Sequence, residues 1–265
     1  MSPAGPALGT RGLAVSAEGR WIVQDLDTTF FRGEFTIIVG PNGAGKTSLV
    51  RALAGLAPSW GEIEIAGVPL TELDGRTRAR AIAYLPQGHE FHWPVPVADI
   101  VGLGRLPHGA GAHLSDLDRT AVSRAMEIAD IVHFAERSVT TLSGGEKARV
   151  ALARVLAVEA PVLLADEPTA ALDARYQLRM LEILRDQAEG GTAVIAVVQD
   201  LTLAARFAHR VMVLDGGKLV ADGDPAQILE EGLLSRTFGV DGAVIERDGA
   251  RVVVPWSVTR GSRRK

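Results

Sequence analysis

The sequence predicts an α/β domain with a mainly parallel sheet, and three observations support this prediction. Residues 35–39 form a short apolar, β-branched run that indicates a buried strand, and a glycine-rich loop and a helix-forming segment follow it. Residues 161–167 and 193–198 are two further apolar runs of strand length. A helical pattern at 147–158 precedes the run at 161–167, and a second helical pattern at 175–189 lies between that run and the run at 193–198. Strands that alternate with helices are typical of a parallel sheet covered by helices.

Composition narrows the class of protein. The chain has 265 residues, of which 47% are hydrophobic, enough for one large domain or two closely joined subdomains. A net charge of −4 gives no indication of nucleic-acid binding, and the absence of cysteine excludes disulfides and thiolate metal sites. We find neither a run of about 18 apolar residues nor a signal-peptide pattern. These features favour a soluble, cytoplasmic protein that reaches a membrane only through a partner.

The N-terminal part predicts a small antiparallel sheet. Residues 1–11 are rich in Pro, Gly and Ala and are expected to form a flexible tail. Short strand-like pieces follow between residues 13 and 31, and residues 62–65 alternate between polar and apolar side chains. Another strand is expected at 82–85 and ends before Gln87.

The remaining segments are predicted in order. Residues 88–111 carry many Gly, Pro and His residues, and helical spacing begins near residue 115, so a helical region is expected over about 88–160. Residues 211–220 indicate a hairpin around two glycines. Residues 232–258 indicate a short β-type appendage, and the basic residues of 260–265 are expected to be solvated and disordered.

The glycine-rich loop matches the pattern G-x-x-x-x-G-K-T of a phosphate-binding loop. Its backbone N–H groups and the following helix N-terminus suit an anion. The alternative is a simple glycine-rich turn, and with average residue frequencies the pattern arises in such a chain roughly once in a hundred. The strand before it and the helix after it favour phosphate binding. The predicted phosphate-binding residues are Gly40, Pro41, Asn42, Gly43, Ala44, Gly45, Lys46, Thr47 and Ser48.

Polar side chains follow three other strand-like runs. Gln87, the pair Asp166 and Glu167, and Gln199 each come directly after such a run. Ligands of open α/β sheets bind at the carboxyl ends of the strands. We therefore expect these side chains to meet the phosphate-binding loop at one edge of the sheet.

These motifs together resemble one family. The loop at 40–47, Gln87, Leu-Ser-Gly-Gly-Glu at 142–146, Leu-Leu-Ala-Asp-Glu-Pro at 163–168 and Ala-Leu-Asp at 171–173 stand in the order and spacing of an ATP-binding cassette. Over residues 12–230 the chain resembles the nucleotide-binding subunit of an ABC transporter. The resemblance implies a P-loop NTPase cassette with an N-terminal antiparallel β subdomain and an inserted helical subdomain, followed by an appendage and tail at 231–265.

The resemblance also implies roles for the strand-end residues. Asp166 would hold Mg²⁺ together with Thr47 and Gln87, and Lys46 would contact the β- and γ-phosphates of ATP. Glu167 would be the general base. Gln199 stands where the family has a switch histidine, and an amide cannot carry the charge of an imidazole. The alternatives are a helix-capping carboxylate and an ordinary surface glutamine.

A second anion site is expected at the start of the helix after residue 143. In the family it reaches the γ-phosphate of ATP bound to the other subunit, which implies a head-to-tail homodimer with ATP between its copies. The alternative is that the first residue merely caps the helix. The residues expected at this dimer contact are Ser143, Gly144, Gly145, Glu146 and Asp173.

Two surface assignments stay open at this point. The aromatic residue that stacks on adenine in the family would fall near Ala17, and Trp21 either replaces it or belongs to the core. The apolar residues of 91–95 form either a docking surface for a permease or a small core.

The pattern Gly-Arg-Leu-Pro-His at 104–108 is similar to ATPases of importers for iron–siderophores, haem and cobalamin. The predicted function is therefore an ATPase, with ATP and Mg²⁺, that drives such uptake through a separate permease at the cytoplasmic face of the cell membrane. A substrate-binding protein would take part indirectly, and no nucleic acid is expected. Three alternatives are a low-turnover nucleotide-binding regulatory module, an importer of another substrate such as a metal ion, and a soluble cassette ATPase of DNA repair or translation.

Overall fold

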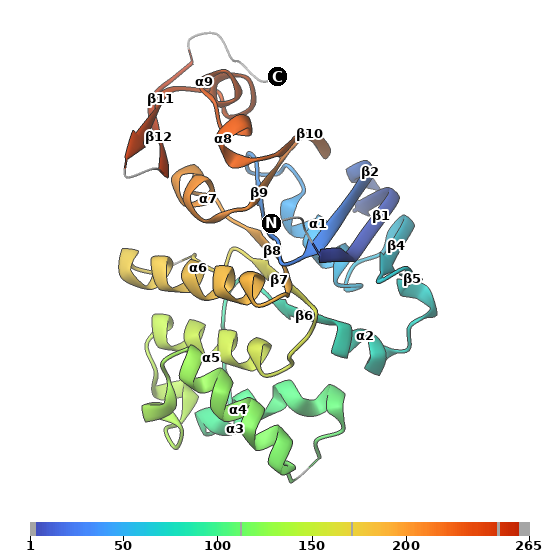
Figure 1. The fold of residues 1–265 in the computed structure, drawn as a ribbon, viewed down its shortest axis with the longest axis vertical. Coiled ribbons are helices and arrows are strands. Elements are labelled where there is room, and N and C mark those ends of the chain that lie inside the picture. Colours follow the sequence, from blue (N-terminus) through green and yellow to red (C-terminus); the bar gives the residue numbers. More distant parts are fainter. Residues whose placement is uncertain (1–3, 112, 171, 248–249, 260–265) are drawn as a thin grey trace.

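A six-stranded sheet forms the centre of the fold in the computed structural model, which describes residues 4–111, 113–170, 172–247 and 250–259 (Figure 1). The strand order is β10-β9-β3-β8-β7-β6. Neighbouring strands are parallel except for the edge pair of β9 and β10, so the predicted mainly parallel sheet is confirmed. The strands are β3 (Phe35–Val39), β6 (Ile82–Leu85), β7 (Val162–Asp166), β8 (Ala193–Val197), β9 (Arg210–Asp215) and β10 (Lys218–Gly223).

The two faces of this sheet pack against different layers. Side chains alternate along a strand, so Phe35 and Ile37 of β3 face one core while Ile38 faces the other. The first core is shared with helices that include α5 (Gly144–Leu156), α6 (Ala174–Glu189) and α7 (Leu201–Phe207). The second core is shared with α1 (Lys46–Leu53) and an N-terminal antiparallel sheet. All five residues of β3 are buried, which explains why its sequence is apolar apart from Thr36.

The N-terminal sheet has the strand order β2-β1-β4-β5 and is antiparallel, as predicted. Its strands are β1 (Ala4–Ala17), β2 (Arg20–Arg32), β4 (Ser59–Ile65) and β5 (Val68–Pro69). The prediction of a flexible tail over residues 1–11 is wrong for residues 4–11, which belong to β1. Register shifts on either side of Pro6 accommodate the proline, and pairing with β2 and β4 buries Leu8. Residues 1–3 lie outside the described part of the chain.

The burial of Leu8 predicts that the first strand contributes to the stability of the fold. The Leu8 side chain is 0% exposed in the second core, so Leu8→Ala is expected to lower the free energy of unfolding by about 2–5 kcal/mol. Leu56→Ala is the matched control, because that leucine is 55% exposed. Urea denaturation of both variants checks the prediction. Equal midpoints for Leu8→Ala and the unmodified protein would show that the first strand adds nothing to stability.

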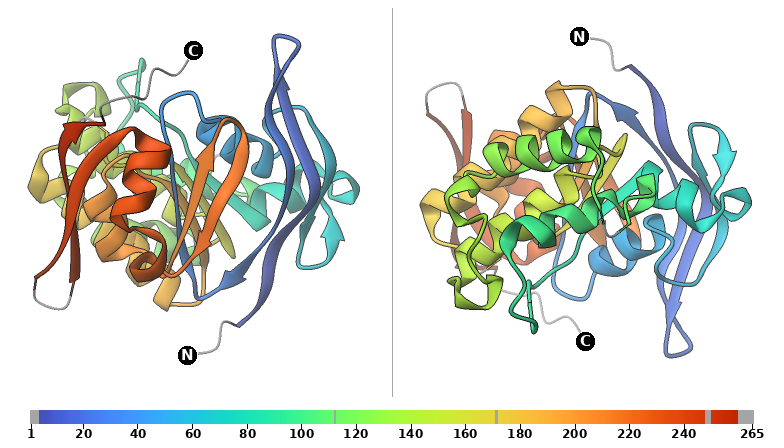
Figure 2. Two further views of the ribbon diagram at one scale, coloured as in Figure 1. Left: turned by 90° about the horizontal axis from the view of Figure 1, so that it is seen from above. Right: turned by 90° about the horizontal axis from the view of Figure 1, so that it is seen from below.

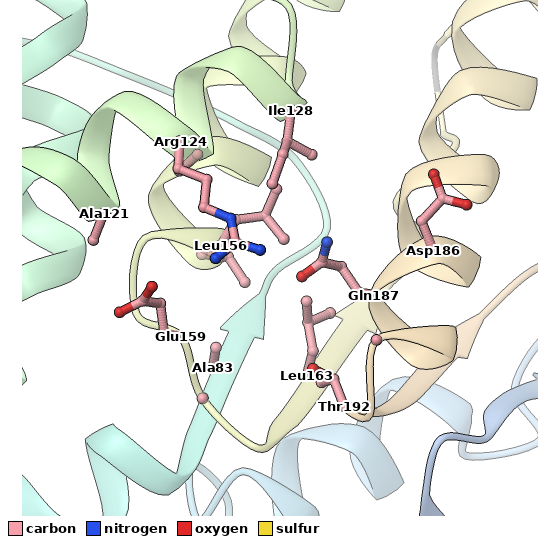
Figure 3. A pocket seen from close by; sticks show the side chains of 14 residues that line it. Ala83, Ala121, Arg124, Ile128, Leu156, Glu159, Leu163, Asp186, Gln187 and Thr192 are labelled. Carbon is pink, nitrogen blue, oxygen red and sulfur yellow. The ribbon is translucent and has the colours of Figure 1, made fainter.

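The elements between β6 and β7 are helical throughout the described residues. They are α3 (Val97–Gly102), η2 (Leu103–His108), α4 (Asp116–Ile128), η3 (Val132–Phe134), η4 (Val139–Thr141) and α5 (Gly144–Leu156). A cleft lies between α4, the C-terminal end of α5 and α6, and residues of β6 and β7 also line it. Arg124 and Ile128 of α4 face Asp186 and Gln187 of α6 across this cleft (Figure 3).

The C-terminal residues form a separate hairpin that packs on α7. Strands β11 (Val240–Arg247) and β12 (Ala250–Val258) pair antiparallel, and Val253 is buried against the first core. Figure 2 shows this hairpin and the β1–β2 ribbon on opposite sides of the molecule. Residues 232–238 are helical rather than β-type, because the chain turns into β11 only at Gly239. The predicted basic tail at 260–265 lies outside the described residues.

The remaining short elements connect these layers. They are η1 (Leu70–Glu72), α2 (Gly75–Ala81), α8 (Pro225–Ile228), α9 (Glu231–Leu233) and one π-helical turn, η5 (Leu234–Phe238). Of the helices in the described ranges, none combines the length and the apolar character needed to cross a bilayer.

Candidate functional site

The glycine-rich loop lies between β3 and α1, as its sequence indicates. Helix α1 begins at Lys46, and Gly45 precedes it in a left-handed conformation. The Lys46 ammonium donates hydrogen bonds to the carbonyl oxygens of Gly40 (2.7 Å) and Pro41 (2.9 Å). Burial lowers the pKa of Lys46, and the nearby carboxylate of Glu167 opposes this effect. The positively charged side chain of Lys46 is therefore held against the backbone of the loop.

Position 40 requires glycine because the backbone of the loop passes close to β9 there. Its φ is +152°, and a Cβ atom at this position would stand 2.1 Å from the Leu214 carbonyl oxygen. Both atoms are fixed by secondary structure, since Gly40 follows β3 and Leu214 belongs to the neighbouring strand β9. A side chain here would displace the loop.

A buried carboxylate lies next to the start of α1. Asp166 ends β7 with only 1% of its surface exposed, and it accepts a hydrogen bond of 3.0 Å from the Thr47 hydroxyl. Burial raises the pKa of Asp166, although the Thr47 hydrogen bond acts in the opposite direction. The pair offers a hydroxyl and a carboxylate oxygen at one point, the ligand chemistry that Mg²⁺ prefers.

Tyr84 is a neighbour of Asp166 that the sequence prediction missed. Burial, together with the nearby Asp166 charge, raises the pKa of Tyr84 to about 12. A signal existed, because Tyr84 is a polar-tipped residue in β6, three positions before Gln87. Its direction relative to β7 is set by the pairing of Tyr84 with Leu164, which the sequence does not reveal.

Glu167 lies over the phosphate-binding loop. It follows β7 with a φ of +49°, a left-handed conformation that is uncommon for a residue with a side chain. Its carboxylate accepts a hydrogen bond of 2.8 Å from the Gln87 amide. Glu167 and Ile22 line one pocket together with residues 42–48.

Gln199 lies on the other side of Glu167. It follows β8, is exposed, and lines a second pocket that also contains Glu167, Thr169 and Asp200. Gln87, Asp166, Glu167 and Gln199 therefore lie with the glycine-rich loop along one edge of the sheet. The topology explains this arrangement, because the three strands that they follow are parallel neighbours.

The residues that are predicted to contact a second subunit lie away from the phosphate-binding loop of their own chain. Ser143 caps the 13-residue helix α5, and Ser143 and Glu146 exchange hydrogen bonds in a capping box. Hydrogen bonds from the Ser143 backbone hold the pKa of Glu146 below its usual value. Asp173 caps α6 and accepts from the Tyr176 amide at 3.0 Å. Neither of the two pockets beside Glu167 is lined by the described residues Ser143, Gly144, Gly145, Glu146 or Asp173.

Two exposed aromatic positions bear on the open assignments. Trp21 is 54% exposed on β2, so it is not a core residue, and its ring meets that of Trp60 edge-to-face with the centroids 5.0 Å apart. Trp93 is 76% exposed, whereas Phe91 and Val95 pack against the first core. The segment at 91–95 is therefore partly core and partly free surface. Ala171 lies outside the described residues.

Comparison with known proteins identifies the family. The family described as ABC transporter matches residues 23–170, which is more than half of the chain. The chain belongs to the ABC transporter family. Its fold is accordingly the predicted ATP-binding cassette, and the protein is an ABC ATPase.

The similarity to individual relatives extends over nearly the whole length of this ABC ATPase. It is 43% identical to the hemin import ATP-binding protein HmuV of Nocardia farcinica, over 96% of this chain and 92% of the relative. It is 40% identical to the cobalamin import ATP-binding protein BtuD of Halobacterium salinarum, over 89% of this chain and 60% of the relative. A solved metal-chelate type ABC transporter in an inward-facing conformation has the same fold, with a TM-score of 0.81 at 24% identity over 97% of this chain and 99% of that chain.

Proposed function

We propose that this ABC ATPase drives the import of an iron chelate such as a siderophore, of haem or of cobalamin through a separate permease. One observation carries the catalytic part: the phosphate-binding loop, Asp166 and the Gln87–Glu167 pair lie together at one edge of the sheet. The similarity to hemin and cobalamin import proteins supports the choice of substrate class.

The loop and its neighbours are suited to Mg·ATP. The α1 N-terminus and the loop amides bind phosphate oxygens, and Lys46 exchanges its bonds to the loop carbonyls for bonds to the β- and γ-phosphates. Thr47 and Asp166 fit a hard cation because they present two oxygen ligands 3.0 Å apart, and Gln87 adds an amide oxygen at the same edge. When bound, Mg²⁺ supplies positive charge beside the phosphates.

Glu167 serves as the general base in this proposal. Its carboxylate orients the attacking water and accepts its proton, and the Gln87 amide holds the carboxylate beside the loop at 2.8 Å. Lys46 and the loop amides stabilise the negative charge that develops on the phosphate oxygens. Gln199 can donate a hydrogen bond to the same region but cannot take up a proton.

A second copy of the chain completes the site. The N-terminus of α5 carries free N–H groups that suit an anion, and the segment that bears them lies outside the pockets beside Glu167. In a head-to-tail dimer Ser143 of each copy contacts ATP on the other copy. The dimer closes on ATP and opens after hydrolysis.

The permease docks on the helical region at the cytoplasmic face of the membrane, and a substrate-binding protein delivers the chelate to the permease. Trp93 is the anchor of this contact, because it is 76% exposed between Phe91 and Val95, which are held in the core. A large aromatic side chain on a fixed base is a typical interface residue.

Uptake assays test the proposed function. The ABC ATPase and its permease are reconstituted together in proteoliposomes, with the substrate-binding protein, and ATP-dependent accumulation of hemin, cobalamin and a ferric siderophore is measured separately. Accumulation of one of them, abolished by Glu167→Gln in the same preparation, is the expected result. ATP hydrolysis without accumulation of any of the three would contradict the assignment of substrate class.

Gln199→His gives a further prediction. An imidazole at this exposed position beside Glu167 can carry charge and move a proton, so the variant is expected to raise kcat several-fold. Steady-state ATPase assays check this, with Gln177→His, in the wall of the same pocket, as the control.

The same assays test the alternative of a regulatory module. If the unmodified protein binds ATP but hydrolyses it no faster than Glu167→Gln, that alternative is correct.

A further inference from the structure

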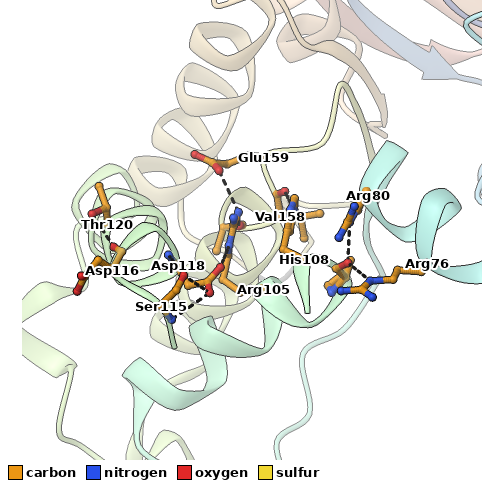
Figure 4. Close-up of polar contacts among 12 residues, drawn as sticks. Arg76, Arg80, Arg105, His108, Ser115, Asp116, Asp118, Thr120, Val158 and Glu159 are labelled. Atoms are coloured by element: carbon orange, nitrogen blue, oxygen red, sulfur yellow. Dashed lines mark hydrogen bonds and ion pairs between the residues drawn. The ribbon is translucent and has the colours of Figure 1, made fainter. Parts of the chain in front are cut away.

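Residues 104–108, Gly-Arg-Leu-Pro-His, connect three helices, α2, α4 and α5. They lie in η2, and four of the five make contacts within the chain (Figure 4). Leu106 is the exception, because its side chain is 55% exposed. The proposed catalytic steps use none of these residues, so their burial and bonding need a separate explanation.

Arg105 is the centre of this cluster. It is only 6% exposed, and its guanidinium donates to three acceptors: the Asp118 carboxylate of α4 (2.9 Å), the Ala157 carbonyl (2.8 Å) and the Glu159 carboxylate (2.9 Å). Asp118 in turn closes the capping box of α4 with Ser115. Ala157 is the C-cap of α5. One buried cation therefore joins the beginning of α4 to the end of α5, where the helix dipole favours positive charge.

The neighbours of Arg105 strengthen the same connection. A Cβ atom on Gly104 would stand 2.3 Å from the Arg154 carbonyl oxygen, so only glycine allows η2 to lie this close to the last turn of α5. The His108 imidazole bonds the Val158 carbonyl at 2.9 Å. The Pro107 carbonyl accepts from two arginines of α2, Arg76 at 2.9 Å and Arg80 at 2.7 Å. The segment thus fixes the junction between α5 and β7 from one side.

The opposite end of α5 carries Ser143. A 13-residue α-helix is about 20 Å long, so a change of direction at its C-terminal end is transmitted to its N-terminal end. The cleft between α4 and α6 runs beside this junction and is also lined by Glu159 (Figure 3). The junction is therefore a place where the helical region can tilt relative to the sheet.

We propose that Arg105 is a positioning residue for ATP hydrolysis: it holds the C-terminal end of α5 so that Ser143, at the other end, meets ATP bound to the partner copy. This inference rests on the head-to-tail dimer of the proposed function. Arg105 lines neither of the two pockets beside Glu167, and in this proposal it acts through its bond to the C-terminal end of α5.

The expected effect follows from the length of α5. A tilt of about 3° about the Arg105 anchor moves Ser143 by about 1 Å, and a misplacement of this size costs up to ~10² in rate. Arg105→Gln is therefore expected to lower kcat about 10- to 100-fold. The Kd for ATP on the same chain should change less than about twofold, because Lys46 and Asp166 lie on other elements.

Two further variants frame this measurement. Arg119→Gln is the matched control, because Arg119 is an exposed arginine of α4 that pairs with Asp116 and makes no contact with α5 in the described structure; it should leave kcat and Kd unchanged. His108→Ala removes one weaker bond of the same junction without leaving a buried charge, and it should lower kcat less than Arg105→Gln does. An unchanged kcat in both Arg105→Gln and His108→Ala would overturn the proposal.

Mixed dimers provide the decisive test. Chains with Lys46→Ala and chains with Arg105→Gln carry different affinity tags, and the mixed dimers are purified through both. In a head-to-tail dimer one site then takes its loop from the Arg105→Gln chain and its Ser143 from the chain with native Arg105, so that site is intact. Because one of the two sites is intact, we expect about half of the unmodified activity, which is about 5- to 50-fold more than in the Arg105→Gln homodimer. A merely structural role of Arg105 would give no such recovery.

A reference pair separates this inference from the proposed function. Mixed dimers of Lys46→Ala and Ser143→Ala chains should recover activity to the same level. Recovery in the reference pair but not in the Arg105→Gln pair would overturn the role of Arg105 while leaving the head-to-tail dimer intact. Failure of both pairs would overturn the head-to-tail dimer and, with it, the role of Arg105.

Discussion

Glu167→Gln is expected to lower kcat for ATP hydrolysis by ~10²–10⁴, the usual contribution of a general base. The amide has the size of the carboxylate and can retain a hydrogen bond to Gln87, so the geometry beside the loop is kept. It cannot accept a proton from water. The Kd for ATP should stay within a few-fold of the unmodified value, because the phosphate contacts come from Lys46 and the loop.

Single-turnover hydrolysis and equilibrium binding of a fluorescent ATP analogue separate the two effects. Glu182→Gln is the control, since this carboxylate lies on the surface of α6 in an exposed pair with Arg179 and should be neutral. A Glu167→Gln protein that hydrolyses ATP at the unmodified rate would place the base elsewhere.

Gly40→Ala is expected to reduce ATP affinity by about 10² or more. The added Cβ would stand 2.1 Å from the Leu214 carbonyl oxygen of β9, so the phosphate-binding loop has to move away from that strand. Loop amides that shift by a few tenths of an ångström lose their alignment with phosphate oxygens, and each charge-assisted hydrogen bond lost costs about 1.5–3 kcal/mol.

Gly43→Ala is the matched control for this substitution. Gly43 has a φ of +79°, so alanine there carries the left-handed backbone cost of about 1–2 kcal/mol, but its Cβ would meet nothing within 4 Å. The control should lower stability while changing ATP affinity only a few-fold. Equal ATP affinities of Gly40→Ala and Gly43→Ala, measured by calorimetry, would show that the approach of β9 does not shape the loop.

The core of the fold and much of the site arrangement follow from local signals in the sequence. Residues 35–39 are buried on both faces, so the strand is apolar apart from Thr36, and the loop that follows it has the glycines that its backbone needs. The strand-end residues Gln87, Asp166 and Gln199 meet because parallel neighbouring strands end at the same edge. These features depend on patterns within a few residues, which a sequence displays directly.

The features that the sequence did not reveal depend on contacts between distant segments. Residues 4–11 have the composition of a tail, yet pairing with two other strands outweighs that composition and buries Leu8. Arg105 looks like a surface arginine in a loop rich in Gly and Pro, and only the approach of Asp118 and Glu159 buries it. Residues 97–108 do lie in the region predicted to be helical, but their Gly and Pro content does not reveal that α3 and η2 form there against α4 and α5.

The left-handed backbone conformation of Glu167 lowers the stability of the folded chain at a residue with a proposed catalytic role. A residue with a side chain in this conformation costs about 1–3 kcal/mol, and glycine would remove most of that cost. Selection for thermal resistance alone should therefore favour Glu167→Gly, a chain that melts later and no longer turns over ATP. With Glu167 as the proposed general base, the chain therefore gives up stability at this position in exchange for a carboxylate beside the phosphate-binding loop.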